Sequence, residues 1–117
     1  MPAAPTRAID PKAIEIAQRH AFDAPTERHA RKLIASVCDP TRLMILRALA
    51  KTPLAASDLA QVLGRTRSAT SQHLRVLREV EAVVPERRGN VIRYRLAPTI
   101  AAELLSEVAS AFDKLAA

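Results

Sequence analysis

Apolar residues recur at helical spacing along most of the chain, and acidic or hydroxyl residues stand where helices would begin. An acid followed by a proline predicts the start of a helix over residues 10–22 and of another at Asp39-Pro40. Thr26 with Glu27 predicts the start of a helix between these two. The apolar residues of the second and third helices that we expect to face a core are Leu33, Ile34, Val37, Leu43, Ile45, Leu46 and Leu49.

The middle of the chain predicts two short helices joined by a tight turn. Ser57 is expected to begin a helix over residues 57–63, and Gly64 is expected to end it. Thr66 is a suitable N-cap for a longer helix over residues 67–80. This succession is typical of a helix-turn-helix, whose second helix can enter the major groove of DNA.

A short hairpin follows the second of these helices. Strands are expected at residues 83–85 and 91–96, with a turn at residues 88–90, and residues 54–56 are a possible third strand that pairs with the hairpin. The alternation predicts one buried face, made by Ile92, Tyr94 and Leu96, and one face toward DNA, made by Val91, Arg93 and Arg95. The predicted fold is mainly α with a small β-hairpin, a winged helix-turn-helix.

The last predicted helix, over residues 98–116, carries a separate apolar stripe in steps of three and four. Packing on its own domain is one interpretation. Three other helices already fill a small core, so the stripe favours contact with a second subunit, together with the helix over residues 10–22. We therefore expect a homodimer whose interface residues are Ile14, Ala101, Leu104, Leu105, Val108, Phe112 and Leu115.

Positive charge is concentrated in the predicted second helix of the helix-turn-helix and in the hairpin that follows it. Residues 64–96 hold eight arginines and three glutamates, a net +5 of the chain's +6. A basic helix and hairpin indicate a polyanionic partner, although a solvated basic face is the alternative. The chain has only three aromatic residues, which argues against single-stranded nucleic acid and favours duplex DNA. The expected DNA-binding residues are Arg67, Ser68, Ser71, Gln72, His73, Arg75, Arg87, Arg88, Asn90 and Arg93, with His73 equally able to pack at the rim of its helix.

The remaining composition limits the other possibilities. A chain of 117 residues is expected to form one domain over residues 10–117, preceded by a mobile tail at residues 1–9. One cysteine excludes an internal disulfide and fits the cytoplasm, and neither a secretory segment nor a membrane span is expected. No Ser/His/Asp set, phosphate loop or carboxylate pair is recognisable. We therefore expect no enzyme, no catalytic residue and no cofactor.

Three motifs resemble the ArsR/SmtB family of bacterial winged-helix repressors. Residues 38–46 (CDPTRLMIL) are similar to the family's "DPTRLxIL" segment, and residues 67–78 (RSATSQHLRVLR) to its recognition helix, "QSxxSxHLxxLR". Residues 87–96 are similar to its wing, "RxGxxxxYxL". The resemblance covers about residues 27–97. It implies a homodimer that binds an operator palindrome and is released by an effector. A repressor without an effector, or a protein-interaction module that uses the basic face, are the alternatives.

The resemblance does not extend to the family's well-known metal sites. Ala55 and Ser57 stand where its arsenic and cadmium sensors have a CxC pair, and the last helix lacks the histidine of its zinc, cobalt and nickel sensors. We expect no metal site, although His20, His29 and Cys38 would form one if the first helices converged.

Cys38 is also a possible redox switch. It lies before a helix start that would stabilise a thiolate, with Arg42 one turn away, although Asp39 opposes that effect. Burial as a small apolar residue is the favoured alternative. The effector itself stays unidentified at this stage.

Overall fold

A computed structural model describes residues 6–116 and confirms a mainly helical fold with a small antiparallel sheet. The tail expected at residues 1–9 lies mostly outside the described residues, so its mobility stays a prediction. The elements are α1 (Pro11–Arg19), α2 (Ala24–Ser36), α3 (Pro40–Leu49), β1 (Leu54–Ala55), α4 (Ala56–Leu63), α5 (Arg67–Glu79), β2 (Val83–Arg88), β3 (Val91–Leu96), α6 (Ile100–Ala111) and a 3-10 turn, η1 (Phe112–Ala116).

Acidic N-caps begin the first three helices. The side chains of Asp10 and Asp39 accept hydrogen bonds from backbone N–H groups in the first turns of α1 and α3, as predicted. The expected start of α2 at Thr26 is wrong, because Asp23 accepts the Thr26 N–H at 2.8 Å and so begins the helix at Ala24. The expected N-cap at Ser57 is also wrong. α4 begins one residue earlier, after Ala55, which makes no side-chain capping bond.

The turn between α4 and α5 forms as the sequence predicts. Gly64 ends α4 in the left-handed region, at φ 62°, where a side chain would be strained. Thr66 then accepts the Ala69 N–H at 3.1 Å and begins α5. The turn of the helix-turn-helix therefore follows from two local residues, Gly64 and Thr66.

The wing is a three-stranded antiparallel sheet in the order β1-β3-β2. The possible strand at residues 54–56 is confirmed, since Leu54 pairs with Tyr94 and Ala55 with Arg93. β2 and β3 pair from Val83 opposite Leu96 to Arg88 opposite Val91, so the hairpin turns at residues 89–90. The expected burial of Ile92 is wrong: this end of the hairpin extends beyond the body, and the side chain is exposed.

The core lies where α3, α4, α5, α6 and the start of β2 meet. Its largest fully buried apolar side chains are Ile45, Leu46, Leu59, Leu74, Leu77 and Val83. Aliphatic packing of this kind positions α5 against the body along one face and leaves its other face to solvent. No helix within residues 6–116 has the length and apolar character needed to span a bilayer.

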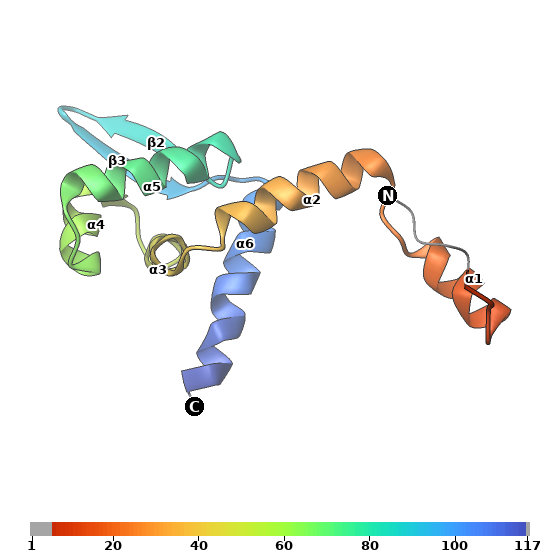
Figure 1. The fold of residues 1–117 in the computed structure, drawn as a ribbon. Coiled ribbons are helices and arrows are strands. Elements are labelled where there is room, and N and C mark those ends of the chain that lie inside the picture. Colours follow the sequence, from red (N-terminus) through yellow and green to blue (C-terminus); the bar gives the residue numbers. More distant parts are fainter. Residues whose placement is uncertain (1–5, 117) are drawn as a thin grey trace.

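The N-terminal helices form an arm that extends away from this body (Figure 1). α1 has no buried residue, and α2 buries only Leu33 and Ser36, near its junction with α3. The expected burial of Ile34 is wrong, because Leu33 and Ser36 turn one side of α2 toward the body and Ile34 lies on another side, where it is exposed.

α6 does not present its whole apolar stripe to solvent. Ala101 and Leu105 are buried in the protomer's own core, where α6 packs on α3, so their expected place in a dimer interface is corrected. The stripe contains two adjacent faces, and only one is exposed. That face carries Leu104, Val108, Phe112 and Leu115.

Candidate nucleic-acid interface

The outer face of α5 presents polar and cationic side chains. Thr70, Leu74 and Leu77 turn inward and are buried, which fixes the rotation of the helix about its own axis. The structure accordingly places five of the predicted DNA-binding residues on the exposed face: Arg67, Ser68, Ser71, Gln72 and Arg75. Arg75 lies 3.5 Å from Glu79, and both side chains are largely exposed, so this pair is weak and can be exchanged for a phosphate.

His73 is not part of that exposed face. Its ring is half-buried, and its Nδ1 accepts a hydrogen bond from the Nε of Arg42 in α3 at 3.3 Å. Of the two roles that the sequence left open, the structure favours packing at the inner rim. A DNA contact by His73 stays a prediction.

A hollow connects α5 to the wing. It has a volume of about 340 Å³ and is lined by Arg67 and Ser71 of α5 together with Asn90 and Tyr94 of the wing. Ala55 of β1 and the first residues of α4, Ala56 and Ser57, also line it. Residues predicted separately from the helix and from the hairpin thus lie around one concave surface.

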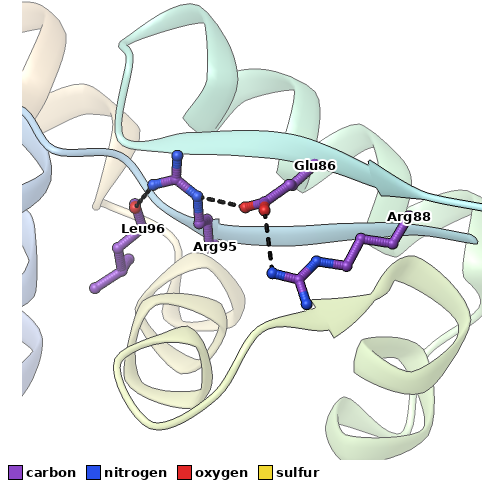
Figure 2. A network of polar contacts seen from close by, with 4 residues as sticks. All are labelled: Glu86, Arg88, Arg95 and Leu96. Carbon is purple, nitrogen blue, oxygen red and sulfur yellow. Dashed lines mark hydrogen bonds and ion pairs between the residues drawn. The ribbon is translucent and has the colours of Figure 1, made fainter.

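The wing holds its own charges in a fixed arrangement, shown in Figure 2. Glu86 accepts from the Nε of Arg95 at 2.8 Å and lies 3.5 Å from an Nη of Arg88. Arg95 also donates to the carbonyl of Leu96 at 3.2 Å. The Arg95 hydrogen bond, despite opposition from partial burial, lowers the pKa of Glu86 and keeps this carboxylate charged.

This network divides the wing arginines into two groups. Arg95 spans the two strands and is bonded within the hairpin, so its expected orientation toward DNA stays a prediction. Arg87, Arg88 and Arg93 keep exposed side chains, with Arg87 also donating to the Gly89 carbonyl near the turn at 3.3 Å. These three are the wing cations that can reach a phosphate backbone.

Sequence reasoning missed two interactions. Arg42 was considered only for its effect on Cys38, and nothing in the chain signals that it reaches a residue 31 positions away. The Glu86–Arg95 pair did have a signal, because a two-residue turn at 89–90 places Glu86 opposite Arg93 and diagonal to Arg95.

Within residues 6–116, no three His, Cys, Asp or Glu side chains come close enough together to hold a metal ion. His20 and His29 are exposed on the arm. The favoured burial of Cys38 is wrong for the protomer. Its thiol is exposed at the α2–α3 junction and donates to the Ile34 carbonyl at 3.2 Å.

Known proteins are similar to this chain in both sequence and fold. A family model described as "Bacterial regulatory protein, arsR family" matches residues 39–83. The HTH-type transcriptional regulator NmtR of Mycobacterium tuberculosis is 42% identical over 93 residues, which cover 76% of this chain and 78% of the relative.

Two solved structures resemble the whole fold. The transcriptional repressor BigR from Xylella fastidiosa superposes with a TM-score of 0.69 at 26% identity, covering 89% of this chain and 96% of that one. Mb0332 from Mycobacterium bovis, described as a homodimeric winged helix-turn-helix DNA-binding domain, superposes with a TM-score of 0.65 at 20% identity. The superposition covers 93% of this chain and 92% of the Mb0332 chain.

Proposed function

Because this chain belongs to the arsR family of bacterial regulatory proteins and is a DNA-binding transcriptional regulator, we propose that it acts as a homodimeric repressor on a two-fold symmetric operator. We further propose that an effector releases it and that it works in the bacterial cytoplasm. One observation carries the proposal: Arg67 and Ser71, on the exposed face of α5, share one hollow with Asn90 and Tyr94 of the wing.

The two cationic surfaces have different roles in this proposal. α5 enters the major groove, where Gln72 suits adenine and Arg67 or Arg75 suits guanine, while Ser68 and Ser71 approach the same base edges. Arg87, Arg88 and Arg93 hold phosphates of the neighbouring backbone, and Asn90 contacts it from the tip of the wing. Arg95 stays within the hairpin and sets its shape.

The dimer is inferred from apolar surface that the protomer leaves uncovered. The protomer has a radius of gyration of 18.6 Å, whereas a compact chain of this length has about 13 Å. α1, a helix of nine residues, has no buried residue, and so short a helix is only marginally stable unless another surface covers it. Both terminal elements carry large exposed apolar side chains: Ile14, Ile16, Phe22, Leu104, Val108, Phe112 and Leu115. A second copy of the chain covers both terminal elements, and Mb0332, which has a similar fold, is homodimeric.

The effector is proposed to be other than a metal at the family's well-known positions. Ala55 and Ser57 lack metal-binding side chains, and both line the hollow beside α5. Cys38 offers an exposed thiol, so a covalent effector is the alternative to an organic ligand.

The proposal is tested by selecting operators from random duplexes, footprinting the protein on them and measuring affinity by fluorescence anisotropy. A palindrome is expected, with half-sites about one helical turn apart. Arg67→Ala should weaken binding strongly, whereas Arg31→Ala, which removes the same charge from the distant arm, should not. Equal affinity for every duplex would contradict sequence-specific repression and favour the protein-interaction alternative.

Release is measured on the same operator with zinc, cadmium, arsenite, peroxide and polysulfide, using wild type and Cys38→Ser. Release by peroxide or polysulfide that disappears in Cys38→Ser supports a covalent switch. Release by stoichiometric zinc or cadmium in both proteins contradicts the proposal of a non-metal effector. No release by any of the five leaves an organic effector or a constitutive repressor, which a small-molecule screen separates.

A further inference from the structure

The side chain of Arg42 connects three helices of the protomer. It belongs to the first turn of α3 and is half-buried. Its Nε donates to Nδ1 of His73 in α5 at 3.3 Å, and its Nη1 donates to the carbonyl of Ser36, at the end of α2, at 3.2 Å. A longer bond of 3.5 Å reaches the Ala35 carbonyl. One guanidinium therefore spans from the arm to the recognition helix.

The end of α2 has few other attachments to the body. The carbonyls of a helix's last turn lack intrahelical partners, and they form the negative end of its dipole. Arg42 supplies both a donor and a positive charge there. Leu33 and Ser36 are the buried residues of α2, and the Ser36 hydroxyl is already used on the Leu33 carbonyl at 2.6 Å. The position of the arm relative to α5 therefore depends strongly on the Arg42 side chain.

The bond to His73 holds one edge of that ring. An arginine guanidinium only donates, so Nδ1 of His73 is the acceptor in this hydrogen bond. His73 directly follows Gln72, and it is Gln72 that lies on the exposed face of α5. A contact at His73 therefore fixes the helix that presents the base-reading side chains, without occupying any of those side chains.

We propose that Arg42 is a positioning residue for DNA recognition, which braces the recognition helix against the end of α2 through Nδ1 of His73. This inference rests on the proposed DNA-binding function. It makes operator affinity depend on two side chains that do not touch DNA. It also gives the arm, and hence the dimer, a direct connection to the base-reading helix.

The first test compares Arg42→Met with Arg47→Met, a matched control. Arg47 lies in the same helix and pairs with Asp113 of η1, so the control removes the same charge and an ion pair but leaves α5 untouched. Arg42→Met should raise the operator Kd roughly tenfold, about the effect of one lost charged hydrogen bond, with an unchanged salt slope. Arg47→Met should leave the Kd within about twofold. Equal loss in both variants would overturn the proposal.

The second test guards against a variant that merely unfolds. In His73→Asn the amide oxygen replaces Nδ1 as the acceptor, whereas His73→Leu offers none. His73→Asn should retain near-wild-type affinity, and His73→Leu should lose as much affinity as Arg42→Met. The double variant that combines Arg42→Met with His73→Leu should bind no more weakly than either of these single variants. Additive losses, or equal losses in both His73 variants, would overturn the brace. Wild-type binding to the operator is measured separately, so failure of the proposed function itself would be seen there.

Discussion

Two exposed residues of α6 provide the sharpest test of the dimer. Leu104 and Val108 are 47% and 39% exposed, whereas Leu105 between them is 3% exposed and belongs to the protomer's core. We expect Leu104→Glu combined with Val108→Glu to yield a folded monomer. Leu105→Glu should instead destabilise the protomer itself, because it places a carboxylate among buried aliphatic side chains.

The expected size follows from the area that remains to be covered. Burying a whole Leu or Val side chain contributes about 1.5–3 kcal/mol, so the exposed part of each contributes about 1 kcal/mol. A two-fold axis uses each position twice, so the two positions together contribute about 4 kcal/mol. At about 1.4 kcal/mol per factor of ten, the dimer dissociation constant should rise roughly a thousandfold.

Sedimentation velocity over a range of protein concentrations measures the dissociation constant, and circular dichroism measures the melting temperature. Ser110→Glu is the matched control, since it adds a charge at an exposed position on another side of the same helix. The double variant should melt as a folded monomer and bind a full operator as weakly as a half-site. A dimer that persists in the double variant but is lost in Ser110→Glu would refute this assignment of the interface.

Three further predictions concern readout, the wing and acid stability. Gln72→Ala should relax preference at one base pair and cost about 1–3 kcal/mol there, and an unchanged selected motif would contradict the rotation of α5. Arg93→Ala should lower the salt slope by about one unit, whereas Arg95→Ala should mainly lower the melting temperature, because Arg95 is bonded within the hairpin. The Thr41 N–H bond, opposed by partial burial, lowers the pKa of Asp39 from its ordinary value near 4. The stability it confers should be full above that value and be lost as pH falls through the lower folded-state pKa, and melting curves should show less acid sensitivity in Asp39→Asn.

The helix starts and the turn could be predicted because they depend on neighbouring residues. Asp39 caps the helix that follows it, and Gly64 adopts a left-handed conformation that other residues disfavour. The errors at this level were also local. Thr26 and Ser57 suit an N-cap, but the N-caps are Asp23, three residues before Thr26, and Ala55, two residues before Ser57. Several nearby residues can serve as the N-cap, so the sequence alone does not determine which of them begins the helix.

The candidate interface divides in the same way. The sequence alone determined that α5 carries an outward polar face, because helical periodicity assigns Leu74 and Leu77 to the other side. It also determined that the wing is cationic. It did not determine that Arg95 is held by Glu86 while Arg93 is exposed, since this depends on strand register and on which cation lies diagonal to the carboxylate.

What the sequence by itself determined is therefore what periodicity, capping and turn chemistry dictate, which is the order of elements and the side of α5 that faces outward. The resemblance of three motifs indicated the family. Only the tertiary structure decided which half of the α6 stripe is covered by α3, and that Arg42 reaches His73 across 31 positions. An apolar stripe in the sequence shows that one face of a helix is apolar, but it does not show which residues cover that face. The covering residues lie elsewhere in the chain, and they are brought there by packing of the whole core.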